Sequence, residues 1–123
     1  MAARVLIVDH QRNLAEALAY LLRRAGYTVR VAANGADALA AAAAESPDVV
    51  LLETSLPDLD GYTLYERLRG EGAGHCGIVV LTANQREAER DKALALGADG
   101  YLVKPFDPAD LIDRVRVLAA ART

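Results

Sequence analysis

Short runs of apolar residues alternate along this chain with segments in which apolar residues recur at helical spacing. Five runs rich in valine, isoleucine and leucine cover residues 4–8, 27–32, 48–52, 77–82 and 100–104. Runs of this length with little polar alternation are typical of strands that are covered on both faces of a sheet. We therefore expect five buried β-strands.

The intervals between these runs have the pattern of amphipathic helices. In the first interval Leu14, Leu18 and Leu22 share one face, and Gly26 is expected to end the helix. Further helices are expected at about 35–45, 62–69 and 85–96, the last of these ending at Gly97.

The C-terminal helix is expected to begin at Pro108, because proline suits the first helical turn and Asp107 is a suitable N-cap. Its apolar face comprises Leu111, Ile112, Val115 and Leu118. Strict alternation of strand and helix indicates βαβ units with parallel strands and right-handed crossovers. The sequence thus predicts a (βα)5 fold, with a five-stranded parallel sheet in a three-layer α/β/α sandwich, as a single domain over residues 1–123.

Composition narrows the range of partners. Of 123 residues, 53% are hydrophobic and 25% are charged, and the net charge of −3 provides no basic surface for nucleic acids or anionic membranes. No apolar run reaches the roughly 18 residues of a membrane span, and the N-terminal run is too short for a signal peptide. The single cysteine, Cys76, allows no internal disulfide and fits a reducing compartment. We expect a cytoplasmic protein.

Polar side chains stand where four of the predicted strands end. The first strand is followed by Asp9 and His10, the third by Glu53, the fourth ends at Thr82, and the fifth ends at Lys104 before Pro105. Ligands of open parallel sheets bind beyond the carboxyl ends of the strands. We therefore expect these carboxylates, the hydroxyl and the ammonium to converge at one edge of the sheet.

Six stretches of the chain together resemble the receiver domain of bacterial response regulators, the CheY-like domain of two-component signalling. They are VLIVDHQ, NGADAL, PDVVLLETSLPDLDGYTL, VVLTA, ALGADGYLVKPF and DPADLIDRV. The resemblance covers nearly the whole chain and implies a flavodoxin-like topology. It also implies that an aspartate at the end of the third strand takes a phosphoryl group from a histidine kinase. In that family Mg²⁺ is held by this aspartate, by the second of two acids after the first strand and by a backbone carbonyl, while a hydroxyl and a lysine contact the phosphoryl group.

Two chemical positions of the family pattern differ in this chain. Asp9 matches the first acid, but His10 stands where the second acid, a direct metal ligand, is expected. Glu53 stands at the phosphoacceptor position, and the backbone of Ser55 stands at the carbonyl ligand. The positions that match the family pattern are Thr82, Lys104 and Tyr101. Tyr101 matches the family's switch aromatic, which turns inward when the hydroxyl residue moves towards the phosphoryl group.

Both differences disfavour efficient phosphorylation. Mg²⁺ prefers hard oxygen ligands, so the His10 imidazole is a poor replacement for a carboxylate. Glu53 is one methylene longer than aspartate, which displaces its carboxylate by roughly 1.5 Å, and a misplacement of about 1 Å can cost on the order of a hundredfold in rate. We expect no catalytic residue and no enzyme activity. We also expect Mg²⁺ to be weakly bound or absent, with Asp9, Glu53 and the Ser55 backbone as residual candidate ligands.

The leading interpretation is an atypical receiver whose output is independent of phosphorylation or impaired in it. The Glu53 carboxylate would then extend towards the place of the phosphoryl group, accept a hydrogen bond from Thr82 and pair with Lys104. The alternative is a receiver that still accepts a phosphoryl group slowly from a histidine kinase, with a substitute metal site. A flavin- or nucleotide-binding protein of the same topology is disfavoured, because DHQRNLAEAL contains no phosphate-binding loop.

Three roles are open for His10. With Asp9 and Glu53 it could bind zinc or another transition metal. It could be a solvated side chain at the rim of the site. The two carboxylates could also favour its protonated form, so that a cationic imidazole replaces the missing metal charge.

The family's usual partner surface is formed by the fourth helix, the fifth strand and the fifth helix. Its charged residues here are Arg86, Glu89, Arg90, Asp91, Lys92, Asp99, Arg114 and Arg116. We expect the partner to be another protein, namely a kinase, an output domain or a regulator, or a second copy of the chain in a two-fold dimer.

Tyr62 is expected to be half-buried at the edge of a helix or strand. Asp58 and Asp60 are expected to form the turn before Gly61.

Overall fold

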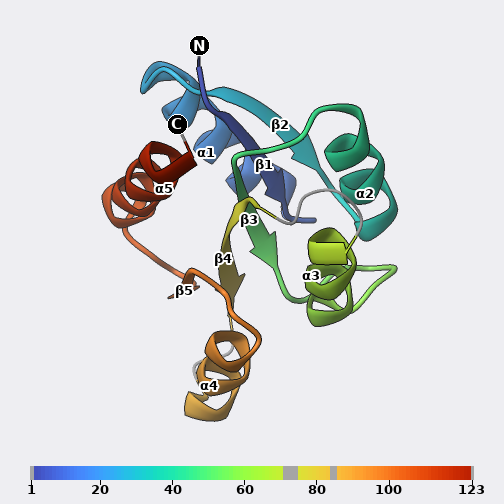
Figure 1. The fold of residues 1–123 in the computed structure, drawn as a ribbon. Helices are drawn as coiled ribbons and strands as arrows, with labels where there is room; N and C mark the ends of the chain where they lie inside the picture. Colours follow the sequence, from blue (N-terminus) through green and yellow to red (C-terminus); the bar gives the residue numbers. More distant parts are fainter. Residues whose placement is uncertain (1, 71–74, 84–85, 123) are drawn as a thin grey trace.

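The computed structural model describes residues 2–70, 75–83 and 86–122 of the chain. Within these residues five strands alternate with five helices, as the sequence pattern predicts (Figure 1). In chain order the elements are β1 (Arg4–Val8), α1 (Arg12–Arg24), β2 (Thr28–Ala32), α2 (Gly35–Ala44), β3 (Val49–Glu53), α3 (Gly61–Gly70), β4 (Gly77–Thr82), α4 (Glu87–Ala95), β5 (Gly100–Val103) and α5 (Pro108–Arg122).

The strands form one parallel sheet in the order β2-β1-β3-β4-β5. Helices α1 and α5 cover one face of the sheet, and α2, α3 and α4 cover the other (Figure 1). This arrangement confirms the predicted (βα)5 fold and its three layers. Strand order reverses between β1 and β3, and the crevice beyond the carboxyl ends at such a point is where ligands of open sheets bind.

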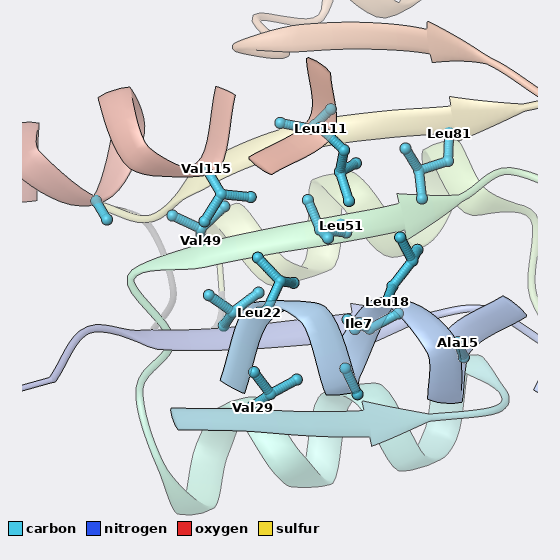
Figure 2. Packing of buried hydrophobic residues seen from close by; sticks show 14 residues of the cluster. Ile7, Ala15, Leu18, Leu22, Val29, Val49, Leu51, Leu81, Leu111 and Val115 are labelled. Carbon is cyan, nitrogen blue, oxygen red and sulfur yellow. The ribbon is translucent and has the colours of Figure 1, made fainter. Parts of the chain in front are cut away.

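The apolar runs of the sequence supply both faces of the sheet. The face below α1 and α5 is packed by residues that include Ile7, Leu18, Leu22, Leu51 and Leu111 (Figure 2). The next strand residues, such as Leu6 and Leu52, point to the opposite face and pack below α2 and α3. Successive side chains of a strand alternate between the two faces, which is why a strand covered on both sides is apolar throughout.

Three strands differ from the prediction by one residue at one or both ends. β2 begins at Thr28 rather than at residue 27, β5 ends at Val103 rather than at residue 104, and β3 runs Val49–Glu53 rather than 48–52. The shift of β3 matters for the site, because Glu53 is the last residue of the strand and pairs in register with Leu81 of β4. The parallel ladder therefore fixes the backbone of Glu53.

Both predicted glycine helix stops are confirmed. Gly26 and Gly97 have φ values of 104° and 98°, and each follows the last turn of a helix, α1 and α4. In both cases the N–H of the residue after the glycine donates a hydrogen bond to the carbonyl five residues earlier, which is the Schellman arrangement.

Asp107 caps α5 as predicted, since its carboxylate accepts from the Ala109 N–H at 2.9 Å. Helix α4 begins at Glu87, and the predicted start at residue 85 lies outside the described residues. None of the described helices is both long and apolar enough to cross a lipid bilayer.

Candidate functional site

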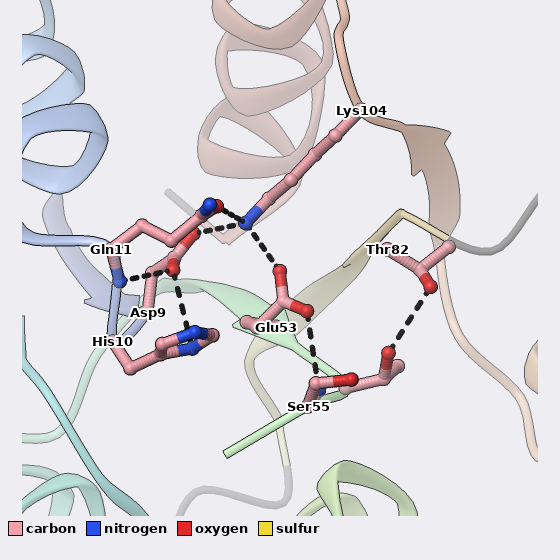
Figure 3. Close-up of polar contacts among 8 residues, drawn as sticks. Asp9, His10, Gln11, Glu53, Ser55, Thr82 and Lys104 are labelled. Carbon is pink, nitrogen blue, oxygen red and sulfur yellow. Dashed lines mark hydrogen bonds and ion pairs between the residues drawn. The ribbon is translucent and has the colours of Figure 1, made fainter. Parts of the chain in front are cut away.

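The carboxyl ends of the strands bring the predicted polar side chains together at one edge of the sheet (Figure 3). Asp9 follows β1, Glu53 ends β3 and Thr82 ends β4. Lys104 follows β5, and its backbone N–H donates to the carbonyl of Thr82 at 2.7 Å. Because all five strands are parallel, residues up to 95 positions apart in the chain meet here.

An ion-pair network centred on the Lys104 ammonium occupies the middle of this site (Figure 3). Its Nζ lies 2.7 Å from Asp9 Oδ2 and 2.5 Å from Glu53 Oε2. It also donates to Gln11 Oε1 at 2.6 Å. The lysine side chain is 12% exposed and both carboxylates are buried, so the pair lies in a region of low dielectric constant. One ammonium thus serves two buried carboxylates, and the three groups together carry one negative charge.

The two oxygens of Glu53 have different surroundings. Oε1 accepts a hydrogen bond from the Ser55 backbone N–H at 3.2 Å. Oε2 is in ionic contact with Lys104, but at an orientation that makes no hydrogen bond, and it accepts none from the rest of the described chain. The short Nζ–Oε2 distance still neutralises much of the charge, so this oxygen is electrostatically paired while one of its acceptor directions is unused.

His10 lies at the rim of the site. Its side chain is 46% exposed, and Nδ1 is 3.9 Å from Asp9 Oδ1, which is too long for a hydrogen bond. That Asp9 oxygen accepts from the Gln11 backbone N–H at 2.8 Å instead. The imidazole is therefore in electrostatic range of the buried carboxylate without being bound to it.

The Thr82 hydroxyl is engaged with the β3–α3 loop. Thr54 Oγ1 lies 3.2 Å from Thr82 Oγ1 at hydrogen-bonding geometry. The contacts that hold the Glu53 carboxylate come from Lys104 and Ser55, and the expected hydrogen bond from Thr82 to Glu53 is not among those of the described residues. Glu53 is therefore directed towards the lysine side of the site.

Two pockets flank the end of β4. The first, here called the α5-side pocket, has a volume of about 500 Å³ and is lined by His10, Gln11, Leu14, Glu53, Ser55, Ala83, Lys104, Pro105, Phe106 and Pro108. The second, the α4-side pocket, has a volume of about 530 Å³ and is lined by Thr54, Ser55, Asp60, Tyr62, Thr82, Ala83, Glu89 and Lys92. Ser55 and Ala83 separate them, so one edge of the sheet carries two distinct cavities.

Comparison with known proteins assigns this chain to a family. The family model of the response regulator receiver domain matches residues 5–116. The chain belongs to the response regulator receiver domains. Among curated relatives, the response regulator MprA of Mycobacterium tuberculosis is 41% identical over 96% of this chain and 51% of its own length. The alkaline phosphatase synthesis transcriptional regulatory protein PhoP of Bacillus subtilis is 37% identical over 96% of this chain and 49% of its own length. The receiver chain thus spans about half the length of the curated relatives it matches.

Solved structures show the same fold. A putative response regulator from Chloroflexus aurantiacus has a TM-score of 0.89 and 38% identity, covering 98% of this chain and 99% of its own. The chemotaxis protein CheY4 of Vibrio cholerae has a TM-score of 0.88 and 30% identity, covering 96% of this receiver and 99% of its own chain. Receiver domains are signalling modules of two-component systems that interact with kinases and output domains.

In this receiver Tyr62 is a site residue that sequence reasoning missed. It is buried rather than half-buried, and its hydroxyl donates to Glu89 Oε2 of α4 at 2.9 Å. The Lys92 ammonium lies 4.3 Å from the centre of its ring. Burial, and then the hydrogen bond to Glu89, raise the pKa of Tyr62 far above its ordinary value. Tyr62 therefore ties the first turn of α3 to α4.

The predicted switch aromatic, Tyr101, lies next to this contact. It is partly buried against Tyr62, Val80 and Ala93, and burial raises the pKa of Tyr101, with a smaller contribution from Glu89. The side chain that could report a conformational change thus shares a cluster with the α3–α4 contact. Sequence periodicity gave no signal for this contact, because its two members lie 27 residues apart on different helices.

Asp58 does more than serve the turn in which it was expected. Its carboxylate accepts from the backbone N–H groups of Gly35 at 2.7 Å and Ala36 at 3.0 Å, at the start of α2. These two hydrogen bonds, the one from Gly35 first, lower the pKa of Asp58. A carboxylate at a helix N-terminus is favoured by the orphan N–H groups and the helix dipole. Asp58 therefore holds the β3–α3 loop of the receiver against α2.

Proposed function

We propose that this receiver is a signalling and protein-interaction module whose output does not require phosphorylation, with Glu53 in place of the phosphoacceptor aspartate. The observation that carries the proposal is the 2.5 Å ion pair between Glu53 Oε2 and Lys104 Nζ. The ammonium that would contact a phosphoryl group in this family is already engaged by two carboxylates, Glu53 and Asp9. A phosphoryl group arriving at Glu53 would have to break a buried ion pair, which is costly.

The donor set also fits Mg²⁺ poorly, which supports the same proposal. Mg²⁺ needs a near-ideal octahedron of oxygen ligands. Both Asp9 oxygens are engaged, Oδ2 by Lys104 and Oδ1 by the Gln11 N–H, and His10 offers nitrogen instead of a carboxylate oxygen. In the part of the chain that the structure describes, no three histidine, cysteine, aspartate or glutamate side chains are placed to share a metal ion. The proposed function therefore uses no metal, and the Lys104 ammonium balances the carboxylate charge.

We propose that the partner is a protein that docks on the surface of α4, β5 and α5. Val117 of α5 is 67% exposed and lines a surface pocket together with Asp99 and Arg114. Single exposed apolar side chains are common on protein surfaces, so support for this surface comes from its place as the usual partner face of the receiver family, and Val117 is the residue at which it can be tested. Sedimentation of the domain, with Val117→Glu as the matched variant, distinguishes a second copy of the chain from a kinase, an output domain or another regulator. Self-association lost in the variant assigns a homodimer, and a monomer at all concentrations assigns a different partner.

Incubation with acetyl phosphate and Mg²⁺, followed by intact-protein mass spectrometry, tests whether the site accepts a phosphoryl group. The unmutated domain is expected to show no stable gain of one phosphoryl group. The double variant His10→Asp/Glu53→Asp restores both acids of the family pattern and is expected to gain it, because Asp9, Thr82 and Lys104 are retained. A stable phosphoryl group that maps to Glu53 in the unmutated domain would overturn the proposal and support slow acceptance from a histidine kinase with a substitute metal.

A further inference from the structure

Helix α4 has few apolar contacts with the core of the domain. Of its nine residues only Ala93 is fully buried, whereas α3 buries five of its ten. The large apolar side chain of Leu94 is 45% exposed. A segment with few buried apolar contacts opens at a lower free energy than the core of the same protein. The position of α4 therefore depends on contacts of another kind.

Tyr62 of α3 supplies these contacts. Its hydroxyl donates to Glu89 Oε2 at 2.9 Å. The centre of its ring lies 4.3 Å from the Lys92 ammonium, and the ring packs in one cluster with Ala93. Glu89, Lys92 and Ala93 are spaced i, i+3 and i+4, so they share the face of α4 that meets Tyr62. We call Tyr62, Glu89 and Lys92 the α4 latch.

The α3 side of the latch is fixed by the backbone around it. The Tyr62 N–H donates to Asp60 Oδ1 at 3.2 Å, and the Gly61 N–H donates to the Thr54 carbonyl at 3.0 Å. A Cβ at Gly61 would lie 2.5 Å from Thr54 Cα, so this turn closely approaches the chain that follows β3. Glu89, by contrast, is half-buried on a helix with one fully buried residue. When the latch breaks, α4 is therefore the part that moves.

We propose that the α4 latch is a conformational device that holds α4 on the domain, and that α4 opens as a unit, with the sheet intact, when the Tyr62–Glu89 hydrogen bond breaks. Tyr101 of β5 packs against the same cluster as Tyr62 and Ala93, so opening changes the surroundings of the switch aromatic from the α4 side. This opening uses neither Glu53 nor a phosphoryl group. It rests on the proposed function in one respect, because α4 is part of the surface on which we propose that a partner docks.

Hydrogen exchange of the unmutated, ¹⁵N-labelled domain at increasing urea concentrations tests whether α4 opens alone. The Ala93 amide lies within α4 and the Ala98 amide donates to the Ala93 carbonyl at 3.1 Å, so both report the opening of α4. Leu51, buried in the central strand β3, reports global unfolding. At low urea we expect the two α4 reporters to be protected at least about tenfold less than Leu51, with a weaker dependence on urea, because opening one helix exposes little surface. Equal protection and equal urea dependence at all three amides would overturn the proposal.

Two matched tyrosine variants assign the opening to the latch. Tyr62→Phe keeps the ring and removes the hydroxyl, so the protection of Ala93 and Ala98 at low urea should fall by about fivefold. Tyr65→Phe makes the same change one turn later in α3, at a hydroxyl that accepts from Arg69 of the same helix. It should leave the protection of the two reporters within about twofold, even where it lowers global stability, because its partner is not in α4. An equal loss in both variants would show that the Tyr62 hydroxyl has no special part in holding α4 and would sink the proposal.

A double-mutant cycle checks that Glu89 is the partner of Tyr62. Glu89→Gln keeps the size of the side chain and makes it a weaker acceptor. We expect about a twofold to threefold loss of protection from this change alone and no further loss when it is added to Tyr62→Phe. The Glu89 backbone carbonyl, 3.4 Å from the hydroxyl, remains as an alternative acceptor, which limits the loss in the single variant. Additive losses from the two changes would contradict the assigned latch.

These measurements need neither a phosphodonor nor a partner, so their outcome is separate from the phosphorylation test. If α4 exchanges only when the whole domain unfolds, the latch falls and the proposed function stands. If acetyl phosphate modifies Glu53 while the α4 amides behave as expected here, the proposed function falls and the latch stands.

Discussion

The two pockets at the end of β4 each contain a glutamate and a lysine, but in contrasting surroundings. In the α5-side pocket Glu53 and Lys104 are in direct ionic contact and are largely removed from water. In the α4-side pocket Glu89 and Lys92 both contact Tyr62, the first by a hydrogen bond and the second over the ring, and Lys92 is exposed. The same residue types therefore form a buried ion pair on one side and a solvated arrangement around an aromatic ring on the other.

The contrast shows how position decides what a charge contributes. Charges near the surface are screened by water, and an exposed ion pair contributes only about 0–1 kcal/mol to the free energy of unfolding. Inside the site, removing one partner leaves an uncompensated buried charge. Hence the α5-side pocket depends on an intact buried network, whereas the contacts of the α4-side pocket hold α3 against α4 at the surface. The predictions below test that difference, from the largest expected effect to the smallest.

Lys104→Met should have the largest effect, because it removes the only ammonium that contacts both Glu53 and Asp9 among the described residues. The free energy of unfolding at neutral pH is expected to fall by about 3–5 kcal/mol, measured by urea denaturation. Lys92→Met makes the same chemical change in the α4-side pocket and should cost only about 0.5–1 kcal/mol. Equal losses in the two variants would show that burial does not distinguish the two pockets.

Gly61→Ala should come next, because it crowds the loop between the pockets. A Cβ at Gly61 would lie 2.5 Å from Thr54 Cα and 2.9 Å from the Glu53 carbonyl oxygen, which are backbone atoms that cannot rotate away. We expect a loss of about 1–3 kcal/mol in unfolding free energy. At Gly70, on the same helix, a Cβ meets no atom within 4 Å, so Gly70→Ala should be neutral or slightly stabilising. A neutral Gly61→Ala would mean that the loop relaxes without cost.

Tyr62→Phe removes one hydroxyl and the hydrogen bond between α3 and α4. The expected loss is about 1 kcal/mol, and Tyr20→Phe, on an exposed ring of α1, should cost much less. The pKa of Tyr62 is raised in the folded state, so its contribution is complete below the unfolded value of about 10 and is lost as the pH rises above it. The unmutated domain should therefore lose stability in alkali more steeply than the variant, as measured by denaturation at several pH values. Parallel pH profiles would contradict the assigned hydrogen bond.

Asp58→Asn should have the smallest effect, because the carboxylate is on the surface. The lowered pKa of Asp58 means that the charged form favours the folded state above the ordinary carboxyl range. That contribution is lost as the pH falls through the lowered pKa. Thermal unfolding of the variant and the unmutated domain should therefore differ at neutral pH and converge in acid. A difference that persists unchanged in acid would show that the cap at Gly35 and Ala36 does not depend on charge.

Several features of the protein were determined by the sequence alone. The alternation of apolar runs and helical segments was sufficient for the fold, because parallel βαβ units leave few arrangements of five such pairs. The helix stops at Gly26 and Gly97 were predictable, because they are local properties of the backbone at those residues. The convergence of Asp9, Glu53 and Lys104 also followed from sequence, since parallel strands place their carboxyl ends at one edge.

Only the tertiary structure decided which of these groups touch. Lys104 meets Asp9 across 95 positions of sequence, and Tyr62 meets Glu89 across 27. No local pattern specifies such pairs, because they depend on side-chain rotamers and on how each helix lies over the sheet. The same reason explains why Glu53 proved to be the last residue of β3, since strand ends are set by pairing with the neighbouring strand. Apolar periodicity is a local signal for burial, whereas the partner of a buried charge depends on which residues the fold brings close together.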